Sequence, residues 1–432
     1  MISSAVSLQQ MLDAREYRAY LQRQLQENGL PLLCLTMNIA GPIKRTPLVR
    51  FLFDAGVQAV MDLELPIKKQ HIIDAATGCE AFFSIDAPAE TIKTAVTALE
   101  DAFPAARLFD LDVLTPEGIK LSRKTPRRCL ICGNPAADCA STRAHGLDAL
   151  TEKTDALLCS FAADRLAELA KDALIKEVYT TPKPGLVDAH NCGAHDDMDL
   201  PMFVCSANAL LPYFREAVQL GLIGCTMQQL REAGLRGEAS MYAATNDVNT
   251  HKGAVFSMGL LLYGMGRVLR IGGTTAKHAA TLVSEDAEQM QQQSRTAPST
   301  NGGYVLANYG VLGARGEAML GFPHAQFARE RLIVHRENGS RHAEALTLCD
   351  LMAVVDDTNL LHRGGPSGLA FAKAEAARIS AIKNEDDQIS ALNKLDEVLI
   401  SRHLSPGGCA DLLALGLLLE QWERLSAHLL GS

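Results

Sequence analysis

Hydrophobic and polar positions follow different periods in the two parts of this 432-residue chain. Between residues 31 and 113, short β-prone apolar runs alternate with helical patterns. We expect strands at 30–41, 79–88 and 106–114, and an amphipathic helix that begins near Ala89. The pattern predicts a small α/β or α+β N-terminal domain.

From about residue 161 onward, apolar positions recur at the helical period. Leu166, Leu169 and Leu174 lie on one stripe of a helix that should end before Pro182. Further helices are expected at 202–220, 254–271, 275–293, 343–355, 368–383 and 409–430. We therefore predict a C-terminal all-α helical bundle with polar motifs between its helices, and divide the chain into residues 1–155 and 156–432.

Composition and charge narrow the classes of function. Hydrophobic residues make up 47% of the chain and charged residues 21%, which is typical of a globular protein. The net charge of −9 argues against a nucleic-acid partner. We find no signal peptide, and apolar stretches such as 254–262 are too short to span a membrane. Eleven cysteines without a secretion signal indicate reduced thiols, so we expect a cytoplasmic protein without a membrane partner.

Polar segments that contain glycine recur between the expected helices of the second domain. They are KPGLVDAHNCGAHDDMD (183–199), TNDVNTHKG (245–253), GARGEAMLGFP (313–323), DDTNLLHRGGPSG (356–368) and SPGGCADLLA (405–414). Each alone is typical of a turn or a helix cap. Their recurrence predicts one polar pocket. Its many carboxylates suit Mg²⁺ better than Zn²⁺, and its Lys and Arg side chains suit phosphates. The chain has neither a P-loop nor a Rossmann fingerprint.

Residues 161–432 resemble the triphosphoribosyl-dephospho-CoA synthases. The matching stretches are PKPGLVD, NCGAH-DM, VNTHKG, GARGEA, DTN---RGG and SPGG-ADLL. The resemblance implies that ATP is joined to 3′-dephospho-CoA with release of adenine. Displacement at the anomeric carbon passes through an oxocarbenium-like state, which carboxylates can stabilise while they move protons.

These residues receive provisional roles from the resemblance and the chemistry of their side chains. We assign Mg²⁺ binding to Asp188, His195 and Asp197, triphosphate and substrate binding to Lys183, Lys252, Arg315 and Arg363, positioning of sugar or phosphate to Asn249, Thr250 and His251, and proton handling and oxocarbenium stabilisation to Glu317 and Asp357.

The first domain contains its own candidate groups. Asp110 and Asp112 are two residues apart on an expected strand, so both carboxylates should lie on one face. Such a pair can hold Mg²⁺ for nucleotidyl transfer, although a solvated edge strand explains it equally well. Lys44 follows a Gly-Pro turn and is a candidate phosphate contact.

The first domain also has a cysteine motif with metal-ligand spacing. Its candidate ligands for a structural Zn²⁺ are Cys129, Cys132, Cys139 and His145, with buried reduced thiols as the alternative.

Residues 8–150 resemble the apo-citrate lyase phosphoribosyl-dephospho-CoA transferases. The resemblance lies in GPIK, RLFDLDVLTPEG, LSR, PRRCLIC and the segment 139–145. It implies a nucleotidyltransferase-type domain that uses Asp110 and Asp112 to attach the prosthetic group to a serine of the citrate lyase acyl carrier (γ) subunit, with release of pyrophosphate. The whole chain then resembles the bifunctional citrate lyase prosthetic-group proteins. The alternatives are an equivalent synthase for malonate decarboxylase, a Mg²⁺-dependent N-glycosidic hydrolase and a non-catalytic nucleotide sensor.

Overall fold

The protein folds into two compact units. The computed structural model describes residues 4–26, 28–285 and 301–430. The first unit contains the chain up to Ala162 together with residues 269–272 and the C-terminal end from 428, and the second contains residues 163–268 and 273–427. The division after Ala162 falls within one long helix, a few residues beyond the predicted boundary.

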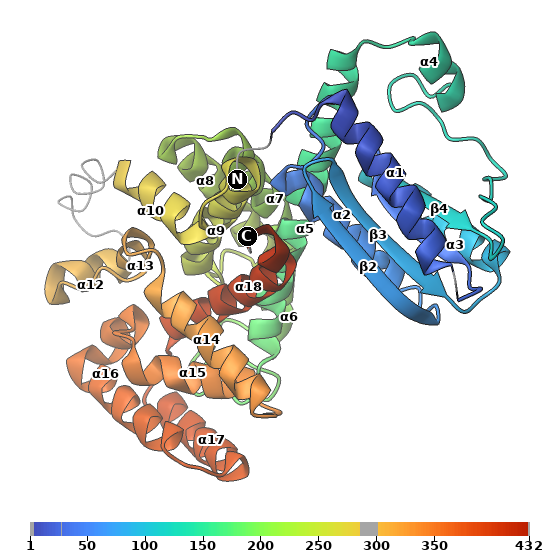
Figure 1. Ribbon diagram of the computed structural model, residues 1–432. Coiled ribbons are helices and arrows are strands. Elements are labelled where there is room, and N and C mark those ends of the chain that lie inside the picture. Colours follow the sequence, from blue (N-terminus) through green and yellow to red (C-terminus); the bar gives the residue numbers. More distant parts are fainter. Residues whose placement is uncertain (1–3, 27, 286–300, 431–432) are drawn as a thin grey trace. The chain divides into compact units, whose positions relative to one another are not determined.

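The first unit is built on a four-stranded antiparallel sheet with the strand order β2-β3-β1-β4 (Figure 1). The strands are β1 (Leu32–Met37), β2 (Ile67–Ala75), β3 (Gly78–Ile85) and β4 (Phe109–Leu114). The predicted strands correspond to β1, β3 and β4. Strand β2 was not predicted, because Lys68, Lys69 and Gln70 make its first half polar, as an exposed edge strand allows.

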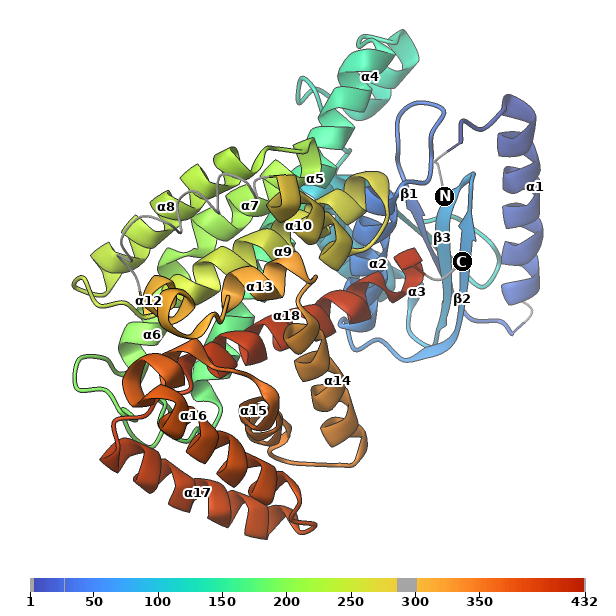
Figure 2. The ribbon, with the colours of Figure 1, turned by 90° about the vertical axis from the view of Figure 1, so that its left-hand side faces the viewer.

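Helices cover both faces of this sheet. Helix α1 (Leu8–Leu25) packs on one face, where Leu21 and Leu25 contact Leu32, Cys34 and Phe82. Helices α2 (Pro47–Met61) and α3 (Ala89–Asp101) cover the other face (Figure 2). The unit also contains a short 3₁₀ helix, η1 (Pro104–Leu108), and α4 (Ala136–Thr142).

The described residues of the second unit form helices and loops, without a strand. Its helices, the first of which begins in the first unit, are α5 (Leu147–Tyr179), α6 (Leu200–Ala209), α7 (Leu211–Ile223), α8 (Met227–Ala244), α9 (Lys252–Ile271), α10 (Thr275–Glu285), α12 (Asn301–Tyr309), α13 (Ala314–Met319), α14 (Pro323–Glu337), α15 (Ala343–Val354), α16 (Thr358–Ser380), α17 (Glu385–Ser401) and α18 (Gly407–Leu430). Helices α16 and α17 lie side by side at one end of the unit (Figures 1 and 2).

One described helix, α9, is long and apolar enough to cross a membrane by length and composition alone. Within the structure, 78% of its apolar window is buried, which is typical of a core helix. Its residues from Ala254 to Leu262 lie in the interior except for the partly exposed Phe256. The apolar pattern of this segment is therefore accounted for by packing inside the unit.

Several helix boundaries differ from the prediction. The helix expected at 202–220 breaks at Leu210, because Pro212 lacks the N–H that a continuous helix would need. Helix α16 begins at Thr358, ten residues earlier than expected, and bends at Gly365, whose φ of 61° is not helical. Helices α8, α12, α13, α14 and α17 were not predicted, and positions 286–293 of the helix expected at 275–293 lie outside the described residues.

Candidate active sites in the two units

The segment that follows α5 turns back on itself around Asp188. This carboxylate accepts hydrogen bonds from the backbone N–H groups of Lys183 (3.0 Å), His190 (2.7 Å) and Asn191 (3.1 Å). Asp188 is only 5% exposed. The carboxylate of Asp188, which we predict to bind metal, thus stabilises the conformation of its own loop.

A second carboxylate, Asp396 of α17, anchors the same loop. It accepts hydrogen bonds from the Gly185 backbone N–H and the Asn191 amide, each at 2.8 Å. Gly185 has φ +73°, and a Cβ there would overlap the Leu404 carbonyl oxygen. Only glycine therefore lets the loop pass so close to the segment before α18.

Lys183 forms a buried ion pair. Its Nζ lies 2.6 Å from Glu177 Oε1, and the two side chains are 2% and 5% exposed. Burial raises the pKa of Glu177, while Lys183 opposes that shift. The Lys183 ammonium group, which we predict to bind phosphate, is therefore already paired with Glu177, a residue outside the five polar segments.

His195 is held as a neutral ring by two neighbours. A guanidinium can only donate, so Arg363 donates to Nδ1 (3.2 Å) and the ring proton lies on Nε2, which contacts Ser405 Oγ at 3.0 Å. Burial and then Arg363 lower the pKa of His195. Arg363 also donates to the Ala194 carbonyl at 3.0 Å.

The predicted metal ligands do not form a ready set of ligand atoms. Both ring nitrogens of His195 are occupied, and Asp188 is hydrogen-bonded to backbone, whereas Asp197 is exposed. Among the described residues, the atoms of these three side chains do not gather into a cluster of metal-ligand size. Their shared assignment to Mg²⁺ therefore remains a prediction, which only Asp197 could satisfy without rearrangement.

His251 contains a buried donor without a partner. Thr250 donates to Ser206 Oγ (2.7 Å), which leaves the Ser206 proton for His251 Nδ1 (2.7 Å). The ring proton then lies on Nε2, for which no described residue provides an acceptor. Burial lowers the pKa of His251 to about 3, so the ring is neutral. Buried donors nearly always find an acceptor, so an Nε2–H without one is suited to a ligand.

Asp357 joins two of the polar segments. Its carboxylate caps α16 by accepting from Asn359 N–H (2.7 Å) and Leu360 N–H (3.0 Å), and it accepts from Cys409 N–H of α18 at 2.8 Å. Burial raises the pKa of Asp357, and the three N–H groups oppose the shift. This residue holds the start of α16 against the start of α18.

Asp411 is a functional candidate that our sequence analysis left without a specific role. It lies in the first turns of α18, and a Cβ on Gly253 of α9 would overlap its carboxylate. The residue keeps some exposed surface, and no described group donates a hydrogen bond to its carboxylate. Burial, followed by the nearby Glu177 and Asp357, raises the pKa of Asp411 well above the usual carboxylate range. The sequence shows that Asp411 belongs to the SPGG-ADLL stretch, but not that its carboxylate lies against α9.

Glu317 is paired with a histidine. Its carboxylate accepts from the backbone N–H of His324 (3.1 Å) and lies 2.5 Å from His324 Nδ1. A Cβ on the nearby Gly313 would come within 2.9 Å of Thr358 Cγ2, so the start of α13 lies against the start of α16.

The remaining predicted groups are less enclosed. Arg315 is exposed, Lys252 Nζ lies 3.2 Å from Glu238, and Asn249 accepts from the Lys252 N–H at 3.2 Å.

The contacts above bring all five polar segments together. His195 joins segment 183–199 to 356–368 and 405–414, Gly253 joins 245–253 to 405–414, and Gly313 joins 313–323 to 356–368. A site made from segments so far apart in sequence requires the folded bundle.

In the first unit, Asp110 and Asp112 lie on the same face of edge strand β4. They pair in register with Thr36 and Cys34 of β1, on the face that α1 covers. Lys120 Nζ lies 2.5 Å from Asp112, and Arg127 lies 3.4 Å from Asp110. The carboxylates therefore face one side, as the two-residue spacing predicts, and each has a cationic partner.

Lys44 lies in the loop that follows β1. Its Nζ donates to the Ile39 carbonyl at 2.6 Å, and burial, followed by the charge of Arg15, lowers the pKa of Lys44. The loop leaves the sheet where Asn38 N–H bonds to the Leu108 carbonyl, next to the start of β4. Lys44 thus belongs to the end of the sheet where Asp110 lies.

The predicted cysteine motif closes into a cluster. The ligand atoms of Cys129, Cys132, Cys139 and His145 all lie within 4.8 Å of one another. Hydrogen bonds from the backbone N–H groups of Cys132 and Ile131 lower the pKa of Cys129 to about 6, and the hydrogen bond with Cys132 raises the pKa of Cys139 to about 12.

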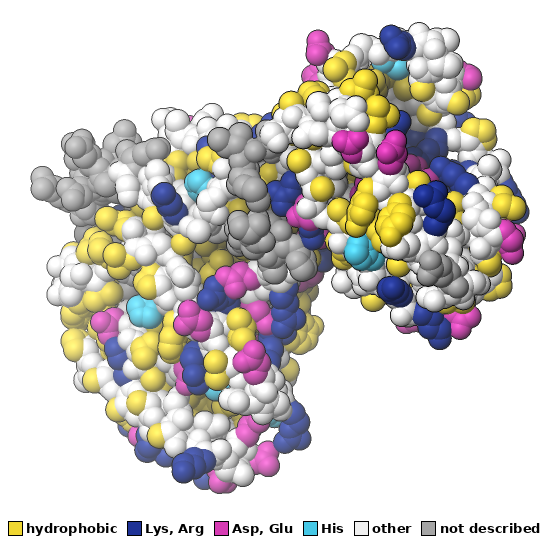
Figure 3. Space-filling model, viewed as in Figure 1, with side chains coloured by type: hydrophobic (Ala, Val, Ile, Leu, Met, Phe, Trp, Pro, Cys, Tyr) yellow, Lys and Arg dark blue, Asp and Glu magenta, His cyan; other side chains and the backbone are white. Residues whose placement is uncertain are grey.

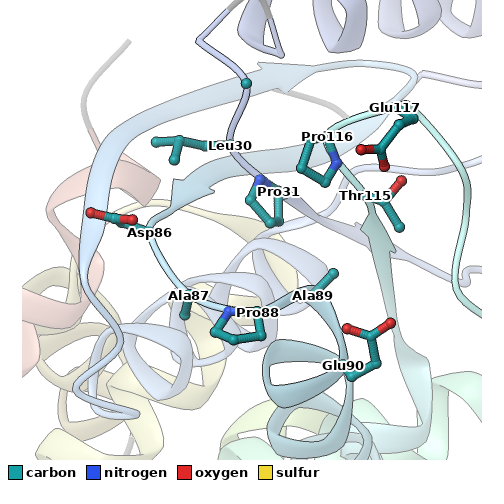
Figure 4. A pocket seen from close by; sticks show the side chains of 11 residues that line it. Leu30, Pro31, Asp86, Ala87, Pro88, Ala89, Glu90, Thr115, Pro116 and Glu117 are labelled. Atoms are coloured by element: carbon teal, nitrogen blue, oxygen red, sulfur yellow. The ribbon is translucent and has the colours of Figure 1, made fainter.

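A cavity of about 530 Å³ opens at the other end of the sheet (Figure 4). It lies beside the paired ends of β1 and β4, at Leu32 and Leu114, and none of the predicted site residues lines it. Asp86, Glu90 and Glu117 make its rim acidic, which disfavours phosphate ligands.

Comparison with known proteins identifies the family. Residues 6–161 match the family of apo-citrate lyase phosphoribosyl-dephospho-CoA transferases, and residues 163–429 match the family of ATP:dephospho-CoA triphosphoribosyl transferases. Protein CitXG of Haemophilus influenzae is 36% identical over 95% of both chains. The chain belongs to the CitXG family.

Two further relatives match nearly the whole chain and about two thirds of it, respectively. Protein CitXG of Leuconostoc mesenteroides is 31% identical over 99% of this chain and 98% of its own. The 2-(5″-triphosphoribosyl)-3′-dephosphocoenzyme-A synthase of Haemophilus ducreyi is 37% identical and covers 66% of this chain and 97% of its own. As a CitXG family member, the protein is a bifunctional transferase: it makes the triphosphoribosyl-dephospho-CoA precursor and transfers the prosthetic group to apo-citrate lyase.

Proposed function

We propose that residues 156–432 carry out the synthase reaction where the five polar segments meet, and that residues 1–155 carry out the transfer. The observation that carries this proposal is the convergence of those segments near two polar groups to which no described residue gives a hydrogen bond, His251 Nε2 and the Asp411 carboxylate. The family matches over 163–429 and 6–161 support the division.

The synthase step moves two protons. The bond between the ATP ribose C1′ and adenine N9 breaks, and a bond forms from C1′ to the 2′-oxygen of 3′-dephospho-CoA. Asp411, whose pKa is raised by burial and by the nearby Glu177 and Asp357, gives a proton to the departing adenine. Glu317, oriented by His324, takes the proton of the attacking hydroxyl. Asp357 keeps α16 and α18 in register beside them.

The triphosphate is held by the groups that remain available. Arg315 is exposed, Lys252 is partly exposed, and the His251 Nε2–H can donate to a phosphate or sugar oxygen. Asp197 offers exposed carboxylate oxygens, which Mg²⁺ prefers, and the ion would neutralise phosphate charge there. Lys183, Asp188, His195 and Arg363 hold the surrounding loops in place, as their hydrogen bonds support.

The transfer reaction uses the acidic pair of β4. Asp110 and Asp112 offer hard oxygen donors on one face, which fits Mg²⁺, and the ion would polarise the phosphate that is attacked. Lys44 and Arg127 supply positive charge near Asp110 for the substrate phosphates. The cluster of thiols and imidazole suits Zn²⁺ instead.

The acceptor is a serine of the citrate lyase acyl carrier subunit, and the reaction takes place in the cytoplasm, where ATP is available. Acidic and basic side chains are interspersed on the face of the helical unit shown in Figure 3, which supports a partner other than nucleic acid.

The synthase proposal is tested by adenine release. The protein is incubated with ATP, Mg²⁺ and 3′-dephospho-CoA, and adenine and the adduct are quantified by chromatography and mass spectrometry. We expect Asp411→Asn to lower the rate by roughly 100- to 10,000-fold while ATP binding is retained. The exposed Asp172→Asn variant serves as the control. Unchanged turnover in Asp411→Asn would refute the role of Asp411, and adenine without an adduct would favour the hydrolase alternative.

A further inference from the structure

The Cys129–Gly133 turn has the backbone pattern of a metal-binding knuckle. The Ile131 N–H lies 3.4 Å from Cys129 Sγ, and the Gly133 N–H bonds to the Cys129 carbonyl at 3.2 Å. Gly133 closes the turn with φ +75°, a conformation that favours glycine. The turn therefore presents the first two sulfur atoms to the same side.

The other two side chains bring the candidate ligands to four. Cys132 Sγ lies 3.5 Å from Cys139 Sγ and 3.3 Å from His145 Nε2. Around a tetrahedral Zn²⁺, bonds of about 2.3 Å to sulfur and about 2.0 Å to nitrogen imply separations of about 3.8 Å between sulfurs and about 3.5 Å between sulfur and nitrogen. The observed separations are close to these values and too long for a disulfide, whose sulfurs lie about 2.0 Å apart.

The segment that carries these ligands has almost no apolar core of its own. No residue from 114 to 150 is buried, and α4 buries none of its side chains. A segment this long that buries so little apolar surface needs another source of stability, and metal coordination supplies one in many small folds.

The same segment reaches the proposed transfer site. Arg127 lies two residues before Cys129, and its guanidinium contacts Glu100, the Phe109 carbonyl (3.0 Å) and Asp110 (3.4 Å). Arg107 of η1 donates to the Arg128 carbonyl. The side chains of Arg127 and Arg107 thus connect the segment that carries the cysteine turn to β4 and to η1, which precedes it.

We propose that Cys129, Cys132, Cys139 and His145 bind one structural Zn²⁺, and that this ion keeps Arg127 in place beside Asp110. The second half rests on the proposed role of Asp110 in transfer. Arg127 is a positioning residue here: the ion orders the segment, and the segment places the guanidinium at the acidic pair.

Metal content tests the first half. Full-length protein purified under reducing conditions should contain about one zinc ion per chain by atomic emission, and Co²⁺ exchanged into it should give the absorption of tetrahedral thiolate-bound cobalt. Cys132→Ser and His145→Ala should lose the metal, while Cys192→Ser, an exposed cysteine outside the cluster, should keep it. Protein without zinc that also fails to bind Co²⁺, an isolated Cys132–Cys139 disulfide, or equal zinc in Cys132→Ser (an adventitious ion only) would each overturn the site.

The two activities test the second half. Removal of zinc by a chelator should lower transfer from purified triphosphoribosyl-dephospho-CoA to the acyl carrier at least about tenfold, the low end of the loss seen when the support of a metal site is removed. Adenine release from ATP should be unchanged in the same sample, which shows that the second unit is folded, and re-added Zn²⁺ should restore transfer. Specific zinc binding with unchanged transfer would overturn the positioning role without touching the proposed function.

Discussion

The buried pair between Lys183 and Glu177 decides whether Lys183 is a ligand for phosphate or part of the framework. Replacing Lys183 with Met leaves the Glu177 carboxylate buried at 5% exposure without its partner at 2.6 Å. Breaking such a pair by removing one partner costs about 3–5 kcal/mol. We expect Lys183→Met to lower the free energy of unfolding of the second unit by that amount at pH 8.

The loss should depend on pH. Burial raises the pKa of Glu177 in the folded protein, and removing Lys183 removes the group that opposes the shift. A carboxyl with a raised folded pKa stabilises the fold fully below its unfolded pKa, and this contribution is lost as the pH rises through the folded value. The Lys183→Met variant should therefore be closest to wild type near pH 5 and furthest from it at pH 8.

Trp422 provides a local probe for this measurement. It is the single tryptophan of the chain and lies 3% exposed in α18, so its fluorescence reports the unfolding of the second unit in urea. Adding Glu177→Gln to Lys183→Met removes the stranded charge and should recover about 2 kcal/mol of the loss. If Lys183→Met unfolds within about 0.5 kcal/mol of wild type at pH 8 while ATP binding falls, Lys183 acts on substrate and our reinterpretation is wrong.

The remaining predictions concern one residue in each unit. Gly253→Ala places a methyl group against the Asp411 carboxylate and should abolish most adenine release. The control, Gly302→Ala, adds a methyl group that meets no atom within 4 Å and should leave adenine release intact. Equal effects of the two variants would show that the contact with Asp411 is irrelevant. Asp112→Asn should make the protein accumulate triphosphoribosyl-dephospho-CoA without transferring it, while Asp86→Asn at the rim of the cavity in the first unit should behave as wild type. Mass spectrometry of the acyl carrier distinguishes the two variants. Normal transfer by Asp112→Asn would exclude a role of this carboxylate in the transfer reaction.

The elements that could be predicted are those in which one local pattern dominates. Strand β4 alternates buried and partly exposed residues, and α9 and α18 are apolar over most of their length, so periodicity found them. Strand β2 and helix α17 are polar on much of their surface, and what holds them is pairing with β3 and packing against α16, which no local pattern reports.

The sequence predicts which segments form the candidate site, but not the role of each residue in it. The polar segments were recognisable because glycine and charged residues recur in them, and the structure brings them together. Whether a carboxylate is free or hydrogen-bonded depends on contacts that only the fold makes: Asp357 accepts from Cys409, 52 residues away, and Glu177 pairs with Lys183 across the turn that follows α5. Sequence therefore favoured Lys183 and Asp188 as ligands and left Asp411 as one of many possible oxygen donors, because its surroundings exist only in the folded bundle.

The central claim is that one chain carries two separable active sites, and complementation tests it most directly. Asp112→Asn and Asp411→Asn are each incubated with ATP, Mg²⁺, 3′-dephospho-CoA and the apo acyl carrier subunit, alone and mixed, and the mass of the carrier is recorded. We predict that wild type modifies the carrier, that neither variant does so alone, and that the mixture restores modification because the intermediate made by Asp112→Asn is used by Asp411→Asn. An unmodified carrier in the mixture, although both variants are folded, would contradict the account.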